Sequence, residues 1–560
     1  MPSSTISLPL AWPQNRSILE KRSSSLLISG RNATVEKTDT QETERSKSGS
    51  LRAGVSIVRS VFSNWVGMAV TGVASFILTP ILIHGLGDFQ YGMWVLVMSI
   101  TDSYGLLDTG MRVTMQRYVA RLKGIEEREA LNETFMTALA IMMAVSFGVC
   151  VLSIVLALFA PTFFHVAGTS RFLFTRLILI VGLTMAIILP TRALGTYLSG
   201  LQRFDLYNLG AIATNILRAV FLVVIIRVGY GVLGVALVGL GTAVFSLLLH
   251  WVLVRWTDRD VSFSMRNVSW RRVRELAGFS FYVYLSTTGD HLRFYTDSLV
   301  IGRVLNVALV TPFSAAGRLL DYFRAAVVGL TSPFMPRMSE LDGQTKQDEL
   351  RATFFEATKA ATILSLFIGS IAFLDGKMLF QLWLGERFTS AYGLLMVLCA
   401  GYLVAMSQWP SVQLILAMGR HRPLGLWTLG EGVANVILSI FWARKYGLIG
   451  VALGTAVPML VTGLLVQPWY VFRLTGISAR DYFQRCMLRP ILAAVLFLIL
   501  LVPGLFRFKP AGLGSFAGLL IFQTVLFTVL MYFVGLHNQD RQAIRIRSIR
   551  LAGSFGWTKM

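Results

Sequence analysis

The octapeptide "YGLIGVAL" at residues 446–453 repeats, almost letter for letter, the octapeptide "YGVLGVAL" at residues 230–237. A Tyr-Gly pair suits a tight turn at the membrane interface, with the aromatic ring at headgroup depth. The glycines and alanines that follow let neighbouring helices approach closely. These properties explain one copy of the octapeptide but not two, so the recurrence predicts an internal repeat.

The composition indicates a membrane protein with many spans. Of 560 residues, 54% are hydrophobic and only 14% are charged, which excludes an ordinary set of soluble domains. The net charge of +22 would suit a nucleic-acid-binding protein, but no aromatic and basic recognition module is present. In a membrane protein, basic residues gather in cytoplasmic loops and against anionic lipid headgroups, and we attribute the charge to these.

Apolar segments of spanning length recur along the chain. With about 20 apolar residues required for each spanning helix, we expect about fourteen transmembrane helices. They are predicted at residues 60–83, 90–111, 134–160, 174–199, 206–227, 231–255, 277–303, 308–336, 353–381, 391–417, 424–443, 447–471, 487–506 and 512–536. The connecting loops are too short for a folded catalytic domain outside the membrane.

Basic residues in alternate loops predict the orientation. The loops at 112–130, 255–274 and 473–489 are rich in Arg and Lys, so the positive-inside rule places them in the cytoplasm. Both termini are then expected on the cytoplasmic side of the cell's inner membrane. The polar, Ser-rich residues 1–55 are expected to form a disordered tail, or to reflect a wrongly assigned start.

The repeat extends beyond the octapeptide. Four further features recur in the same order: Pro190 and Pro410, Gly210 and Gly430, Asn215 and Asn435, and the tripeptide "GTA" at 241–243 and 454–456. The two copies are separated by an even number of spans and therefore have the same orientation in the membrane. We expect two parallel repeats of about six helices with a substrate site between them. The expected divisions are 1–55 (cytoplasmic tail), 56–256 (first bundle), 257–475 (second bundle), 476–537 (two additional helices) and 538–560 (basic tail).

Two segments carry a resemblance to a known family. The segments "GLGDFQYGMWVLVMSITDSYGLLDTGMRVTMQRYVA" (85–120) and "NVILSIFWARKYGLIGVALGTA" (435–456) resemble the Wzx-type polysaccharide biosynthesis proteins. These are oligosaccharide-lipid flippases of the multidrug/oligosaccharidyl-lipid/polysaccharide (MOP) exporter superfamily. The resemblance implies two six-helix bundles that form a V-shaped central cavity and expose it alternately to the two sides. It also implies transfer of a polyprenyl-pyrophosphate-linked O-antigen, exopolysaccharide or capsule repeat unit from the cytoplasmic to the periplasmic leaflet.

Charged residues inside two predicted spans are the candidate functional residues. The segments "TTGDHLRFYTDSLV" (287–300) and "GRLLDYFRAA" (317–326) place several charges at bilayer depth. Each charge costs at least about 2.5 kcal/mol there, so these side chains are expected to face water or one another. Arginines suit a pyrophosphate or glycan because they donate paired hydrogen bonds, and the candidates are Arg293, Arg318, Arg324 and Arg218. Carboxylates suit the uptake of H⁺ or Na⁺ as a coupling ion, and the candidates are Asp290, Asp297, Asp321 and Glu431.

Two alternatives stay open for these charges. Asp290 could pair with Arg293, and Asp321 with Arg318 or Arg324, as structural neutralisation. Asn215 and Asn435 are expected to make hydrogen bonds between helices. Asp102 and Asp108 are weaker candidates in the predicted span 90–111, and Asp108 is expected to have a structural role at a helix end.

The leading function is a flippase without covalent chemistry, cofactor or bound metal. No Walker-type phosphate loop is present, so ATP hydrolysis is not expected. A cation-coupled small-molecule exporter shares the architecture, but the arginines argue against it. A glycan polymerase or glycosyltransferase would need a larger outer loop for its catalytic groups. The expected partners are the lipid-linked oligosaccharide, the bilayer and a polysaccharide polymerase with its export machinery, but no nucleic acid.

Overall fold

The computed structural model describes residues 72–107, 109–124, 127–277, 281–505, 512–538 and 540–542. These ranges contain helices and turns and no β-strand, and ten of their helices are long and apolar enough to cross a membrane. The predicted all-α, multi-pass membrane fold is therefore confirmed. The predicted tail at 1–55 and most of the basic tail at 538–560 lie outside the described residues.

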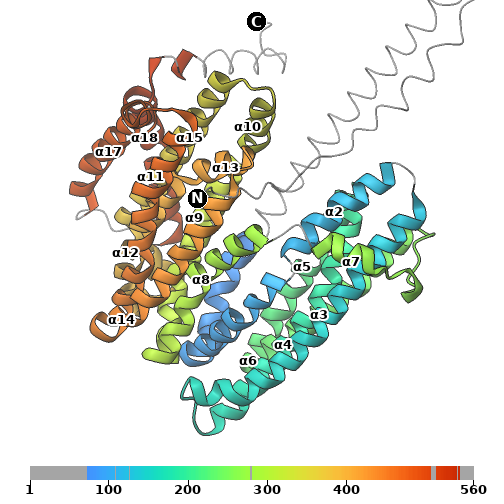
Figure 1. Cartoon of the computed structure of the whole chain (residues 1–560). Helices are drawn as coiled ribbons and strands as arrows, with labels where there is room; N and C mark the ends of the chain where they lie inside the picture. Colours follow the sequence, from blue (N-terminus) through green and yellow to red (C-terminus); the bar gives the residue numbers. More distant parts are fainter. Residues whose placement is uncertain are drawn as a thin grey trace, which may run out of the picture. The chain divides into compact units, whose positions relative to one another are not determined.

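The first group of helices follows the chain from residue 72 to residue 257 (Figure 1). It consists of a helix at 72–102, η1 (Ser103–Leu107), α2 (Thr109–Gly124), α3 (Arg128–Phe163), α4 (Thr169–Gly200), α5 (Phe204–Val228) and α6 (Gly231–Thr257). Helix α4 packs against α3 and α6, and α5 packs against α6. Their buried residues form two hydrophobic clusters. Packing and polar contacts hold such helices together in lipid.

The second group begins after a surface linker that contains η2 (Met265–Asn267) and α7 (Trp270–Ala277). It consists of α8 (Phe281–Val304), η3 (Val307–Leu309), α9 (Val310–Thr331), α10 (Phe334–Gly343), α11 (Gln347–Leu384), η4 (Glu386–Ser390), α12 (Ala391–Ser407), α13 (Trp409–Ala417), α14 (His421–Val461), η5 (Thr462–Val466) and α15 (Gln467–Thr475). Helix α8 packs closely along α14, and α12 contacts α9, α11 and α14.

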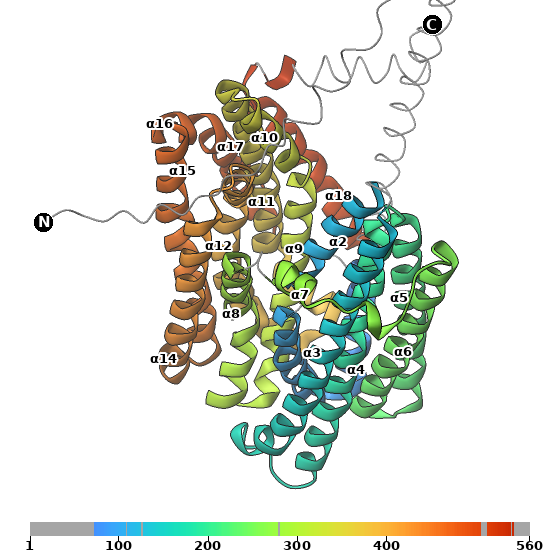
Figure 2. The same cartoon turned by 45° about the vertical axis from the view of Figure 1, so that its right-hand side comes forward.

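The remaining helices pack on the outside of the second group (Figure 2). They are α16 (Ala479–Tyr482), η6 (Phe483–Leu488), α17 (Arg489–Leu505), α18 (Leu513–Leu530) and η7 (Met531–Gly535). Helix α17 contacts α11 and α18. That the last two spans are additions to the repeat stays a prediction.

The ten candidate spans are fewer than the predicted number for two physical reasons. First, two of the ten are interrupted by a glycine in the left-handed region, Gly87 with φ of 72° and Gly447 with φ of 59°. Second, α8 and α9 are not among the ten, and both carry the charges noted in the sequence. The helix positions agree with the predicted segments, whereas the number fourteen stays a prediction, as do the domain boundaries.

The glycine of the repeated Tyr-Gly turn has a similar φ in both copies. Gly231 has φ of 61° and Gly447 has φ of 59°. A side chain at either position would strain this left-handed conformation, which explains why glycine follows tyrosine both times. The sequence repeat therefore corresponds to a repeated local structure.

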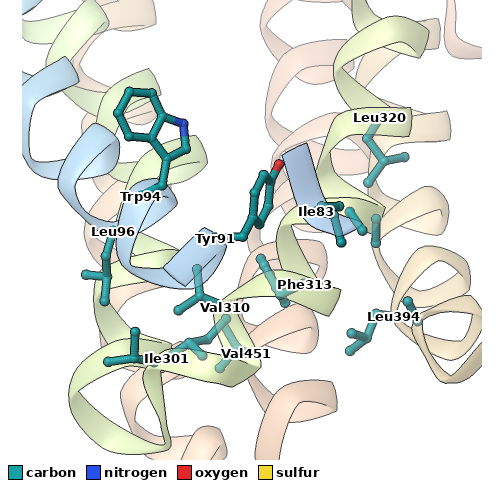
Figure 3. Close-up of a cluster of buried hydrophobic side chains, with 14 of the residues drawn as sticks. Ile83, Tyr91, Trp94, Leu96, Ile301, Val310, Phe313, Leu320, Leu394 and Val451 are labelled. Atoms are coloured by element: carbon teal, nitrogen blue, oxygen red, sulfur yellow. The ribbon is translucent and has the colours of Figure 1, made fainter. Parts of the chain in front are cut away.

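A buried hydrophobic cluster joins the helix at 72–102 to other helices of the first group and to the second group. Figure 3 shows part of it, with residues of the first helix lying among residues of α8 and α9: Ile83, Tyr91, Leu96, Ile301, Val310 and Phe313. A Cβ atom at Gly92 would collide with the carbonyl oxygen of Val307. Beside the cluster, Asp88 forms an ion pair with Arg387 at 3.4 Å. This end of the helices is opposite the basic loops.

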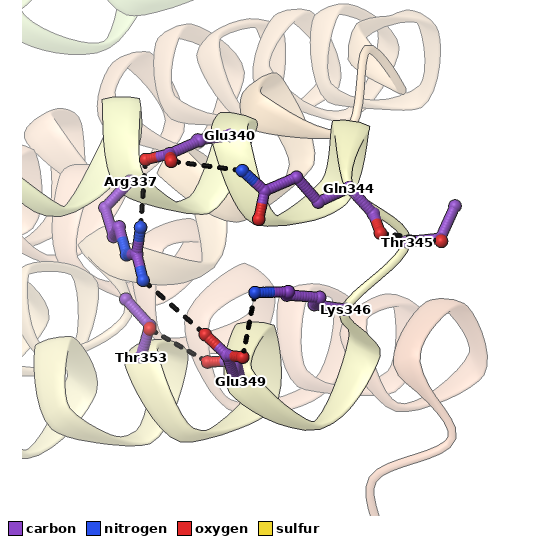
Figure 4. Close-up of polar contacts among 7 residues, drawn as sticks. All are labelled: Arg337, Glu340, Gln344, Thr345, Lys346, Glu349 and Thr353. Atoms are coloured by element: carbon purple, nitrogen blue, oxygen red, sulfur yellow. Dashed lines mark hydrogen bonds and ion pairs between the residues drawn. The ribbon is translucent and has the colours of Figure 1, made fainter.

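Exposed ion pairs join α10 to α11 (Figure 4). Arg337 contacts Glu340 at 3.0 Å and Glu349 at 3.5 Å, and Lys346 contacts Glu349 at 3.4 Å. Exposed pairs of this kind stabilise a fold only slightly, by roughly 0–1 kcal/mol each. We assign them to the orientation of α10 rather than to the function.

Candidate functional site

A cluster of arginines brings together residues of both groups. Asp102 of the first helix lies within electrostatic range of Arg192 of α4, Arg218 of α5 and Arg318 of α9. Arg218 and Arg318 are both exposed to solvent. Together with Arg192 they place three guanidinium groups near two carboxylates, because Arg318 also contacts Asp321 at 3.9 Å. Guanidinium groups gathered in this way suit an anion, since each can donate paired hydrogen bonds.

Arg318 is positioned by neighbours on two helices. Its guanidinium group lies close to the phenol of Tyr91, which belongs to the first helix. It also contacts Asp321 at 3.9 Å, and both side chains of this pair are about half exposed. The predicted pairing of Arg318 with Asp321 is therefore present. Tyr295 of α8 lies within electrostatic range of Arg318 and Arg324. Polar side chains therefore extend along α9 from Arg318 to Arg324.

Arg293 has a different partner from the one considered in the sequence. Its Nη1 atom lies 3.0 Å from Oε1 of Glu431 on α14, and the suggested partner Asp290 lies within electrostatic range of it. Arg293 is 8% exposed and Glu431 is 4% exposed. The other carboxylate oxygen of Glu431 accepts a hydrogen bond of 2.7 Å from Thr462. The close packing of α8 on α14 at Gly289 brings these charges together, since a Cβ there would collide with the backbone of α14.

The four predicted substrate arginines occupy two places. Arg218 and Arg318 belong to the cluster between the groups, whereas Arg293 and Arg324 lie inside the second group. The guanidinium carbons of the latter two lie 4.6 and 4.7 Å from the ring centre of Phe294. Such cation–π contacts stabilise a desolvated guanidinium.

Asp297 lies in a group of uncharged oxygen atoms between α8 and α14. It is 4% exposed and accepts hydrogen bonds from Thr455 at 2.6 Å and from Ser439 at 3.4 Å. Asn435 donates to the Thr455 hydroxyl at 2.9 Å within α14 and to the backbone carbonyl oxygen of Arg293 on α8 at 3.4 Å. The second of these confirms its expected bond between helices. The Asn435 Oδ1 atom is buried and has no hydrogen-bond partner within the described residues.

The four predicted carboxylates therefore differ in their surroundings. Glu431 and Asp321 have arginine partners, and Asp290 lies within electrostatic range of Arg293 and Arg324. The recorded partners of Asp297, within the described part of the chain, are all uncharged.

Sequence reasoning missed three residues that the structure brings to these sites. Arg192 lies inside the predicted span 174–199, where the cost of a membrane-buried charge should have marked it. Ser439 follows Asn435 by four residues, so the two share a helix face. This spacing could have identified Ser439 from the sequence. Thr455 was noted only as part of the repeated "GTA".

Comparison with known proteins agrees with this architecture. Residues 57–342 match the family described as polysaccharide biosynthesis protein. The chain is 19% identical to a putative O-antigen transporter of Shigella flexneri, over 76% of this chain and 99% of the relative. It is 22% identical to a probable low-salt glycan biosynthesis flippase, Agl15, of Haloferax volcanii, over 50% of this chain and 60% of the relative.

Among solved structures, the lipid II flippase MurJ in an inward closed conformation has a similar fold, with a TM-score of 0.65 and 13% identity. That comparison covers 88% of this chain and 99% of the MurJ chain. The family match includes the first helix, the arginine cluster and the start of the second group. The chain belongs to the polysaccharide biosynthesis family of multi-pass membrane proteins.

Proposed function

We propose that this protein is a flippase that moves a polyprenyl-pyrophosphate-linked oligosaccharide from the cytoplasmic to the periplasmic leaflet of a bacterial inner membrane. The names of its relatives support transport of a lipid-linked glycan. Both termini lie in the cytoplasm in this proposal. The oligosaccharide then passes to a polysaccharide polymerase and its export machinery.

The observation that carries the proposal is the cluster of Arg192, Arg218 and Arg318 around Asp102. Its residues come from both helix groups, and three arginines lie beside two carboxylates, Asp102 and Asp321. A pyrophosphate offers oxygens with which guanidinium groups form strong, paired hydrogen bonds. Because alternating access moves the groups relative to each other around a shared site, residues on both sides can hold the headgroup during the change. A site for small organic cations would need negative charge instead.

The function is tested with vesicles that contain the purified protein. The probe is a fluorescent polyprenyl-pyrophosphate oligosaccharide, and a soluble pyrophosphatase cleaves only the molecules in the outer leaflet. Vesicles with the protein are expected to lose the whole lipid signal, whereas protein-free vesicles keep the inner-leaflet half. Equal protection in both preparations would refute the proposed function.

Asp297 and its neighbours are the proposed coupling site. The Asp297 carboxylate and the Asn435, Ser439 and Thr455 side chains present oxygen ligands of the type that hard cations prefer. The free Asn435 Oδ1 atom supports this fit, since a buried oxygen normally has a partner. A bound Na⁺ or a proton would neutralise Asp297, whose charge would otherwise be costly at this depth.

Replacing Asp297 with asparagine is expected to abolish ion coupling while the helices still pack. With Na⁺ coupling, added Na⁺ raises the melting temperature of the purified wild-type protein above that in K⁺, because a ligand that binds only the folded state stabilises it. The variant should show no difference between the two salts. With H⁺ coupling, transport in vesicles instead stops when the pH gradient is dissipated. If the variant keeps full gradient dependence, Asp297 is not the coupling residue.

A further inference from the structure

A cavity of about 220 Å³ lies inside the second group. Helices α8, α9, α12, α13, α14 and α15 contribute to its lining. The charged residues in the lining are Asp290, Arg293, Arg324 and Glu431. Among the uncharged residues are Phe294, Trp409 and Gln467.

The charges of this cavity balance one another. Two arginines face two carboxylates, and Arg293 is already paired with Glu431 at 3.0 Å. The cluster around Asp102 has more arginines than carboxylates, whereas this cavity has equal numbers of the two. It therefore favours a neutral polar ligand over a phosphate.

Four buried polar atoms in the lining have no hydrogen-bond partner within the described residues. Two are donors, the Arg293 Nε and the Trp409 Nε1, and two are acceptors, the Gln467 Oε1 and the Glu431 Oε1. The Glu431 Oε1 atom still has its ion pair with Arg293 at 3.0 Å. Arg293 is 8% exposed and Gln467 is 6% exposed. A buried group left unpaired costs roughly 1–3 kcal/mol, so a bound molecule that both donates and accepts would be stabilised here.

The aromatic residues and the size of the cavity narrow the class of ligand. Phe294 and Trp409 add flat apolar surfaces beside the unpaired polar atoms, a combination that suits the C–H faces and hydroxyl groups of a sugar ring. At about 30 Å³ per water molecule, the volume equals roughly seven waters, which is room for one pyranose ring but not for an oligosaccharide.

The position of the cavity fits loading from the cytoplasm. Trp409 and Gln467 lie in the halves of their spans that end at basic loops, so both belong to the cytoplasmic side in the predicted orientation. Arg324 lies six residues beyond Arg318 on α9, or about 9 Å along the helix. A pyrophosphate held by Arg318 could thus carry its first sugars towards this cavity.

We propose that the cavity binds one neutral sugar ring of the transported oligosaccharide, while the arginine cluster holds the pyrophosphate. This assignment rests on the proposed function and deepens it, because it names the residues that recognise the glycan. The ion pair between Arg293 and Glu431 then holds the wall of a sugar site and does not bind phosphate.

The test measures sugar binding by saturation-transfer difference NMR on the purified protein in lipid nanodiscs. The probes are glucose, galactose, mannose and N-acetylglucosamine. The test variant combines Trp409→Phe with Gln467→Met, which removes one donor and one acceptor but keeps an aromatic ring and a long side chain. At least one probe is expected to bind the wild type, and the variant should bind it about tenfold more weakly, since two hydrogen bonds are lost.

A matched control comes from the same group of helices. Trp427→Phe with Gln413→Met also removes a buried indole N–H and a buried amide oxygen that have no partner within the described residues, but neither residue lines the cavity. This control should bind the sugar like the wild type. If the double variant does not fold, Gln467→Met alone gives the same comparison with Gln413→Met.

Two results would overturn the sugar site: no binding of any probe to the wild type, or equal binding to the test variant. The proposed function and the sugar site can fail separately. A protein that binds a sugar but moves no lipid-linked oligosaccharide in vesicles has the sugar site but is not a flippase. A protein that moves the lipid-linked oligosaccharide but binds no sugar is a flippase that lacks the sugar site.

Discussion

Arg293→Ala is expected to lower the free energy of unfolding by about 3–5 kcal/mol, because removing one partner of a buried ion pair leaves the other charge uncompensated. That other charge is Glu431, which is 4% exposed and would retain only the hydrogen bond from Thr462. Thermal unfolding of the purified variant and its folded yield in the membrane measure the effect.

The matched control for this prediction removes both charges. Arg293→Met combined with Glu431→Gln should regain most of the lost stability, because a buried pair replaced by groups of similar size is often no less stable. A double variant as unstable as Arg293→Ala would show that packing around Arg293, and not its charge, is responsible. Wild-type stability of the single variant would contradict the ion pair itself.

Arg318→Ala is expected to have the opposite pattern, with normal folding and lost transport. Arg318 and its partner Asp321 are both about half exposed, so water can solvate the aspartate that is left behind. Loss of a charged hydrogen bond of about 1.5–3 kcal/mol should weaken binding of the pyrophosphate headgroup roughly 10- to 100-fold. The initial rate of the vesicle assay, at a lipid concentration below saturation, measures this loss.

Arg337→Ala provides the control for Arg318→Ala. Arg337 also contacts carboxylates, but it lies on the exposed α10–α11 corner, and its replacement should leave the transport rate unchanged. Full transport by Arg318→Ala at a normal protein level would remove the arginine cluster from the substrate site. Together with the Arg293 variants, this comparison separates arginines that hold the fold from those that face the substrate.

The membrane-spanning segments could be predicted from the sequence because the information is local. Each span must supply about 20 consecutive apolar residues, and the helices from α3 to α6 begin and end within a few residues of the predicted segments. The Tyr-Gly turns were equally visible, since glycine at a left-handed position is a property of a single residue. The charged segments in α8 and α9 are local in sequence too, so they identified the helices that carry candidate residues.

The partners of those charges could not be predicted, because they depend on how distant helices pack. Arg293 contacts Glu431, which is far away in the sequence, and the spacing within α8 gave no reason to prefer it to Asp290. Arg192 joined the cluster around Asp102 only through the packing of α4 near the first helix. The uncharged surroundings of Asp297 likewise come from two segments of α14 on either side of Gly447.

The sequence by itself determined the class of the protein, its helical segments, its repeat and the family it resembles. Those features follow from hydropathy and from short motifs, which act over a few turns of helix. Only the tertiary structure decided which arginines face water, which of the four predicted carboxylates has only uncharged partners among the described residues, and that the predicted substrate arginines divide between the cluster around Asp102 and the cavity in the second group. The physical reason is that electrostatic and hydrogen-bond partners act over a few ångströms, and the packing register of helices such as α8 and α14 sets those distances.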